Sequence, residues 1–148
     1  MDAEAVDRLI RVRIRRQEIR IPSVLWSGVM LFSVRMALKF RGFGWTVRWI
    51  RRRIRGAPKT SPVDTTRVKA TEHAVAMAGA LYPGRALCLE QSLVLYYVLR
   101  RQGVDVKFAM GVQPHPFLAH AWVEYGDEPI NDVIEHVKQF ARLPDELS

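Results

Sequence analysis

The stretch RALCLEQSLVLYYVLRRQG, Arg85–Gly103, combines the most apolar helical pattern of the chain with its single cysteine. It follows a Pro83-Gly84 turn and ends in two arginines and a glycine, the basic last turn and glycine stop typical of a helix end. Cys88 therefore stands at the start of a predicted helix, where the positive end of the helix dipole stabilises a thiolate relative to a thiol. This makes Cys88 a candidate nucleophile. A free cysteine is also often only a small buried hydrophobic residue, and that alternative stays open.

After this helix the apolar period changes from that of a helix to two. VDVKFAMGV, Val104–Val112, alternates as a half-buried strand does. QPHPF, Gln113–Phe117, is predicted as a loop because its two prolines cannot donate to a strand ladder. AHAWVEY, Ala119–Tyr125, is a second strand with His120, Trp122 and Glu124 on one side. Gly126-Asp127 is a turn, and Pro129–Val137 begins as a third strand.

The N-terminal part of the chain is predicted to be helical. Residues 1–55 divide into three helical pieces, with breaks near Ile21-Pro22 and at Arg41–Gly44. Residues 56–64 are a linker rich in proline and small polar residues, and a helix covers Thr66–Leu81. A chain of 148 residues is one domain by default, so we expect residues 1–148 to form one α+β unit, with the catalytic core in residues 65–148.

The net charge of +8 is unevenly distributed. Residues 1–69 carry 17 Lys and Arg against 5 Asp and Glu, whereas residues 70–148 carry 6 against 10. There are two basic clusters, Arg8–Arg20 and Arg48–Arg55. Four interpretations of them stay open: solvated helix faces, a nucleic-acid surface, a peripheral membrane contact, or a docking surface for an acidic protein. No nucleic-acid-binding module accompanies them, so specific nucleic-acid binding is not expected.

Other features limit the location and the cofactors. One cysteine excludes an internal disulfide, and MDAEAVDRLI is no signal peptide. The longest apolar window, Val24–Val34, has eleven residues, short of the ~20 that a spanning helix needs. A cytoplasmic protein is therefore expected. The sequence contains no spacing of residues typical of a metal site, and no cofactor is implied.

A catalytic thiolate needs a base, and the base needs an orienting group. Of the four histidines, His120 lies near the start of a strand, a rigid place for a base, and a turn centred on Gly126 would place it opposite Asp132. Directly opposed residues can form a carboxylate–imidazole hydrogen bond, although a register slip of one residue would remove it. The hypothesis is a triad of Cys88, His120 and Asp132. The remaining histidines, His73, His115 and His136, are placed outside it.

The order C-L-x-x-S-L-x-L-Y, then H-A-W-V-E, then N-D resembles the transglutaminase-like cysteine peptidases that remove leaders from lasso-peptide precursors. It is similar to their stand-alone form, which lacks a fused leader-binding winged-helix domain. The resemblance covers about Pro83–Val137, and extends to the basic N-terminal half in character only. It implies a papain- or transglutaminase-like core, in which a Cys-bearing helix packs on a small antiparallel sheet. It also places the family's nucleophile on Cys88, its base on His120 and its orienting acid on Asp132.

The resemblance implies hydrolysis of one peptide bond at the leader–core junction, through an acyl-enzyme. The implied partners are the precursor peptide, a separate leader-binding protein and an ATP-dependent cyclase that closes the macrolactam. The Cys88 backbone N–H is the first expected oxyanion donor, and Gln91, which stands where many relatives carry a basic residue, is a candidate for the second. Two alternatives stay open: acyl transfer to an amine, as in true transglutaminases, and a non-catalytic basic interaction protein.

Overall fold

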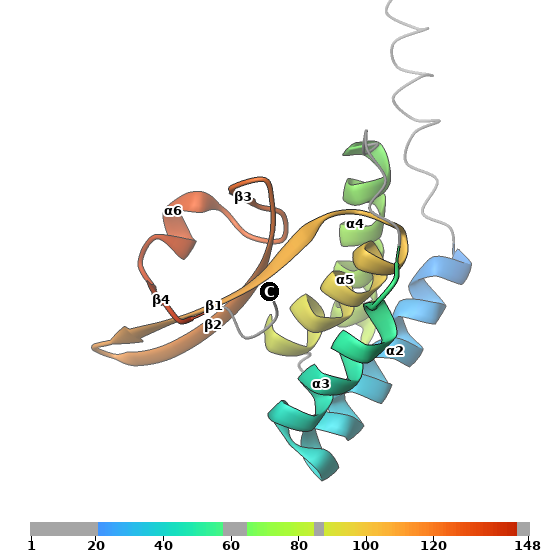
Figure 1. Cartoon of the computed structure of the whole chain (residues 1–148), viewed down its shortest axis with the longest axis horizontal. Coiled ribbons are helices and arrows are strands. Elements are labelled where there is room, and N and C mark those ends of the chain that lie inside the picture. Colours follow the sequence, from blue (N-terminus) through green and yellow to red (C-terminus); the bar gives the residue numbers. More distant parts are fainter. Residues whose placement is uncertain (1–20, 58–64, 85–87, 145–148) are drawn as a thin grey trace, which may run out of the picture.

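The helix that begins at Cys88, α5 (Cys88–Arg101), lies between a group of three helices and a sheet (Figure 1). The coordinates are those of a computed structural model, and the structure describes residues 21–57, 65–84 and 88–144. The three surrounding helices all contact α5 and are α2 (Ile21–Arg41), α3 (Phe43–Ile54) and α4 (Thr65–Leu81). The apolar run of α5 thus becomes the centre of the core, since both layers cover it.

The burial of α5 is nearly complete along its middle. Leu93, Val94, Leu95 and Leu99 are each at most 1% exposed. Their neighbours in the same core come from α2, α3, α4, β1 and β2, so helices and sheet share one hydrophobic cluster. Burying a large aliphatic side chain contributes roughly 1.5–3 kcal/mol, which makes this contact the main force that holds helices and sheet together.

The predicted break between the second and third helical pieces is confirmed. Gly42 separates α2 from α3 with a φ of +78°, a left-handed conformation that glycine adopts without strain. The predicted break at Ile21-Pro22 falls where α2 begins, and the residues before it lie outside the described residues, as do residues 58–64 of the predicted linker. The proposed subdivision of the chain into parts stays a prediction.

The sheet has four antiparallel strands in the order β3-β2-β1-β4. They are β1 (Val106–Pro114), β2 (Phe117–Tyr125), β3 (Glu128–Pro129) and β4 (Ala141–Arg142), with the short helix α6 (Ile134–Val137) between the last two. One face packs on α5, and α6 lies on the other side of the β1–β2 hairpin (Figure 1). A second cluster of Ala109, Trp122, Val137 and Phe140 fills that other side. The predicted α+β class, with a Cys-bearing helix on a small antiparallel sheet, is confirmed.

Two local predictions differ from the structure. Gln113 and Pro114 extend β1 and Phe117 begins β2, so the connection is only His115-Pro116, because a proline is tolerated at the end of a strand. The third strand is also shorter than predicted: β3 ends at Pro129, and the chain then turns into α6.

One face of α2 is both apolar and exposed. Leu25, Val29, Phe32 and Phe40 are each more than half exposed, at helical spacing. Its segment Ser23–Arg41 is long and apolar enough to cross a membrane, and 17% of that window is buried. This finding rests on length and composition alone, and the expected cytoplasmic location stays a prediction. The window includes Arg35, whose guanidinium lies 3.9 Å from the Glu90 carboxylate on α5.

Candidate active site

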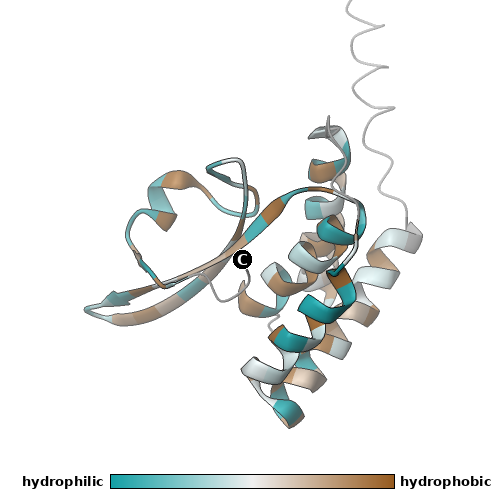
Figure 2. Ribbon diagram, in the orientation of Figure 1, coloured by the Kyte–Doolittle hydropathy of each residue, from teal (hydrophilic) through white to brown (hydrophobic). Residues whose placement is uncertain are grey.

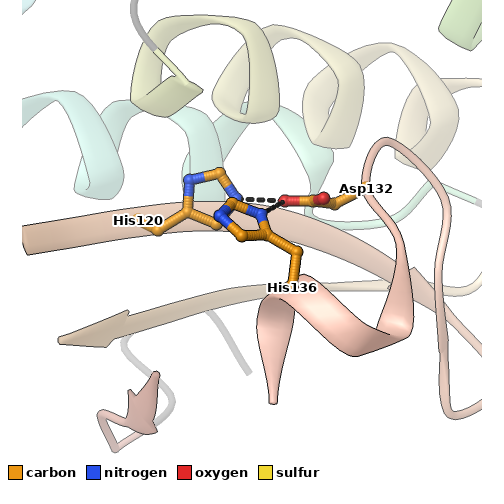
Figure 3. A group of neighbouring side chains, drawn as sticks. All are labelled: His120, Asp132 and His136. Atoms are coloured by element: carbon orange, nitrogen blue, oxygen red, sulfur yellow. Dashed lines mark hydrogen bonds and ion pairs between the residues drawn. The ribbon is translucent and has the colours of Figure 1, made fainter. Parts of the chain in front are cut away.

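The imidazole of His120 and the carboxylate of Asp132 are in direct contact, through His120 Nε2 and Asp132 Oδ2 (Figure 3). His120 lies on β2 and Asp132 in the loop between β3 and α6. Both side chains are largely buried, with 17% and 14% of their surface exposed. Because Nε2 faces the carboxylate, Nδ1 is the ring nitrogen that could exchange a proton with a thiol.

The contact forms in a different way from the one predicted. The β2–β3 ladder pairs Glu124 with Pro129 and Tyr125 with Glu128, one residue away from the predicted register. In that ladder His120 would not face Asp132. The pair meets because the chain leaves the ladder after Ile130, whose N–H donates to the Val123 carbonyl at 2.8 Å. The predicted register was wrong, whereas the predicted proximity of the two side chains is present.

A second histidine, which the sequence hypothesis left outside the site, contacts the same carboxylate. His136 of α6 places its Nδ1 2.8 Å from Asp132 Oδ2. The centroids of the His136 and His120 rings are 4.9 Å apart, and Figure 3 shows both rings converging on Asp132. The spacing of Asp132 and His136, four residues apart, was the available signal in the sequence. A spacing of four brings two side chains together on a helix but not on a strand, and this segment is predicted from the sequence to begin as a strand.

The pKa of Asp132 is lowered by its hydrogen bonds. Burial acts in the opposite direction and would raise this pKa. The hydrogen bond from His136, that from the Val133 backbone N–H at 2.7 Å and the interaction with His120 together outweigh burial. Asp132 is therefore ionised near neutral pH, the form needed to hold an imidazolium or to orient a neutral imidazole.

Cys88 is the first residue of α5 and is half-buried. Among the described residues it makes no hydrogen bond with His120, so the structure does not show a closed thiol–imidazole pair. Its helix face is nevertheless defined by Ser92, one turn later, whose hydroxyl donates to the Ala121 carbonyl at 2.9 Å. Residues four apart share a helix face, so Cys88 lies on the side of α5 that faces β2.

A buried hydrogen-bond network holds this arrangement, and the sequence did not reveal it. Asn131 donates from Nδ2 to the Ser92 hydroxyl at 2.9 Å, and its Oδ1 accepts from the Val123 N–H at 2.8 Å. Ser92 is fully buried. The network therefore connects α5, β2 and the loop that carries Asp132. In the sequence, Ser92 and Asn131 stand only as members of the C-L-x-x-S and N-D patterns, with no contact assigned to them.

Aromatic rings and an ion pair surround His120. Its ring stacks on the Trp122 ring, with the two centroids 5.8 Å apart, and its centroid lies 5.2 Å from that of the Phe140 ring. Trp122 in turn donates from its indole N–H to Glu124 at 2.8 Å, and Arg142 of β4 binds the same carboxylate at 2.9 Å. His120, Trp122 and Glu124 thus share one side of β2, as predicted, and their contacts restrict the orientation of the His120 ring.

Gln91 packs against α4. Its amide nitrogen lies 2.6 Å from the position that a Cβ on Gly79 of α4 would occupy. The side chain therefore packs between α5 and α4, where the absence of a side chain at Gly79 leaves room for it. This packing against α4 does not favour Gln91 as the second oxyanion donor, and that role stays a prediction.

Comparison with known proteins agrees with this architecture. The family model described as the transglutaminase-like superfamily matches residues 30–145. The microcin J25-processing protein McjB of Escherichia coli is 40% identical over 45 residues, which cover 30% of this chain and 22% of that protein. No solved structure matches the chain. Since the family match extends from α2 to beyond β4, over well more than half of the chain, the protein belongs to the transglutaminase-like superfamily.

Proposed function

We propose that this protein is a cysteine peptidase that removes the leader from a ribosomally made lasso-peptide precursor. The single observation that carries the proposal is the His120–Asp132 contact, formed on the strand β2 to which the helix that begins with Cys88 is also bonded, through Ser92. Membership of the transglutaminase-like superfamily and the partial similarity to a microcin-processing protein support the same role. The aligned segment spans only 22% of that relative, so the activity is inferred from the site and not transferred from the name.

In the proposed mechanism Cys88 is the nucleophile. His120 accepts the thiol proton at Nδ1, while Asp132 holds the ring through Nε2 and stabilises the imidazolium. The thiolate attacks the scissile carbonyl, and the developing oxyanion is stabilised by the Cys88 backbone N–H. The imidazolium then protonates the leaving amine of the core peptide. Water, activated by the neutral imidazole, hydrolyses the acyl-enzyme and releases the leader.

The same proposal assigns partners to the protein in the cytoplasm. The precursor peptide is the substrate, a separate leader-binding protein presents it, and an ATP-dependent cyclase closes the ring on the freed amine. For the leader-binding protein we propose the surface formed by α2 and α3. Residues 21–57 contain eight Lys and Arg and no Asp or Glu. Leu25, Val29 and Phe32 give α2 an exposed apolar face, and Figure 2 shows hydrophilic and hydrophobic residues along α2 and α3. A protein with an acidic and apolar contact surface is complementary to it.

The decisive experiment combines the protein with a precursor and its leader-binding protein, and identifies the products by mass spectrometry. Free leader and core support hydrolysis. A product in which the leader is joined to an added amine would indicate transglutaminase-type acyl transfer instead, and absence of any covalent change would favour the non-catalytic alternative. Binding to anionic vesicles in place of the protein partner would reassign the α2–α3 surface to a membrane contact.

Four variants test the assignment of roles. Cys88→Ala should abolish cleavage, and His120→Ala should be nearly as severe, because the leaving amine loses its acid. Asp132→Asn should cost no more than these, since losing the orienting acid in serine proteases costs ~10⁴ in rate against roughly 10⁶ for losing the nucleophile or base. His115→Ala, in the exposed β1–β2 connection, is the control. Cleavage by folded Cys88→Ala would refute the mechanism.

A further inference from the structure

The proposed mechanism uses one histidine on Asp132, whereas the structure has two. His120 Nε2 and His136 Nδ1 both face Oδ2 of the same carboxylate, and Oδ1 accepts the Val133 N–H. Nothing in the peptidase mechanism requires the second imidazole. His136 is 45% exposed, so it reaches the carboxylate from the solvent side.

Two imidazole nitrogens and a carboxylate oxygen that converge from different elements form a ligand set suited to a divalent transition metal. The three ligand atoms lie within 4.8 Å of one another. At zinc–ligand distances of 2.0–2.1 Å, a tetrahedral site needs ligand atoms about 3.3 Å apart. Side-chain movements of about 1 Å would therefore convert the hydrogen-bonded cluster into three ligands.

We propose that His120, Asp132 and His136 form a zinc site, and that zinc bound there inhibits the enzyme reversibly. The fourth position of the tetrahedron is left to water. The ligands come from β2, from the loop after β3 and from α6, so no short sequence spacing reveals the complete set. The proposal differs from the expectation from the sequence, which assigned no metal site.

The inhibition follows from the position of one proton. A neutral imidazole carries a single N–H, and coordination uses the Nε2 lone pair of His120. Its proton must then lie on Nδ1, so the ring cannot accept the proton of Cys88. Zinc also takes over the Asp132 oxygen that orients His120.

The inference has two parts with separate tests. Zinc binding is independent of the function, whereas inhibition rests on the peptidase function proposed above. Binding is measured on the full-length protein by isothermal titration calorimetry with zinc chloride. Wild type should bind one zinc ion, and His136→Gln should bind it about tenfold more weakly or worse, because one of three ligands is lost. The matched control is His115→Gln, an exposed histidine outside the cluster, which should bind as wild type does.

Circular dichroism first shows that each variant is folded. Equal zinc affinity of His136→Gln and wild type would overturn the site, and so would the absence of stoichiometric binding. If Cys88→Ala lost as much zinc affinity as His136→Gln, the fourth ligand would be the Cys88 thiolate and not water. That outcome overturns the three-ligand description.

Inhibition is measured as the cleavage rate with added zinc, relative to each protein's own metal-free rate. Wild type should lose activity in proportion to zinc occupancy and recover it with a chelator, and His136→Gln should need about tenfold more zinc for the same loss. Zinc-insensitive or zinc-stimulated cleavage would overturn the inhibitory role. If the protein binds zinc through His136 but cleaves no precursor under any condition, the proposed function fails and the zinc site stands.

Discussion

Replacing Ser92 by alanine tests whether the buried network aligns the site. The substitution removes the hydroxyl that donates to the Ala121 carbonyl and accepts from Asn131 Nδ2, both at 2.9 Å. No cavity larger than one oxygen atom results, so packing changes little. The Ala121 carbonyl loses its partner beside the fully buried position of Ser92, and the amide of the partly buried Asn131 loses one as well.

The magnitude follows from these two groups. A buried polar group that loses its partner costs about 1–3 kcal/mol, and alanine recovers part of this because no hydroxyl has to be buried. The expected loss in the free energy of unfolding is therefore about 2–3 kcal/mol. For a chain of this length that corresponds to a fall in the melting temperature of roughly 6–10 °C.

Ser33→Ala is the matched control. Ser33 also donates from its hydroxyl to a backbone carbonyl at 2.9 Å, that of Val29, but on the exposed surface of α2. Water replaces this bond, and alanine favours the helix by a few tenths of a kcal/mol. The free energy of unfolding should stay within about 0.5 kcal/mol of wild type.

The assays are thermal and urea unfolding followed by circular dichroism, and single-turnover cleavage well below the melting temperature. Because Ser92 holds the Cys88 helix to the residue after His120, we expect Ser92→Ala to slow cleavage by about 10–100-fold while Ser33→Ala leaves it unchanged. Equal stability of the two variants would refute the energetic reasoning. A destabilised Ser92→Ala that cleaves at the normal rate would show that the network holds the fold without aligning the site.

Three further predictions concern other parts of the molecule. Arg52→Glu, on the exposed side of α3, should weaken binding of the leader-binding protein, most strongly at low salt, whereas the control Lys107→Glu on β1 should not. Isothermal titration calorimetry at two salt concentrations measures both affinities. Equal effects of the two substitutions would contradict the assigned surface. Gly111→Ala should cost about 1–3 kcal/mol in urea unfolding, since its Cβ would lie 2.7 Å from the Phe140 Cβ, and an unchanged midpoint would show that the chain after α6 adjusts freely. The pKa of Asp132 is lower in the folded than in the unfolded chain, so its stabilisation is complete above the unfolded pKa of about 3.9 and is lost as the pH falls through the folded value. The difference in melting temperature between wild type and Asp132→Asn should therefore shrink in acid, and a constant difference would refute this.

Local patterns determined most of the elements. The apolar run of α5, the glycine at its end and the period-two alternation after it are properties of neighbouring residues, and they predict a helix followed by strands without knowledge of the fold. Gly42 likewise predicts a helix break, because the ability to adopt a positive φ without strain belongs to glycine itself. The α+β class followed from this order of elements. The triad hypothesis needed only that Cys88 begins a helix and that His120 and Asp132 flank one turn.

The extent of the strands and the contacts of the site were decided by the tertiary structure. A ladder register depends on both strands, and β3 pairs for only two residues before α6 and the Phe140 ring take over the packing. Asp132 therefore meets His120 through a loop and not through a ladder pair. His136 joins them only because α6 folds back over the sheet, and Gln91 turns to α4 because Gly79 leaves room for it there. Such contacts link residues from separate elements, and their free energy exists only once those elements are packed together. A pattern of neighbouring residues contains no information about that packing.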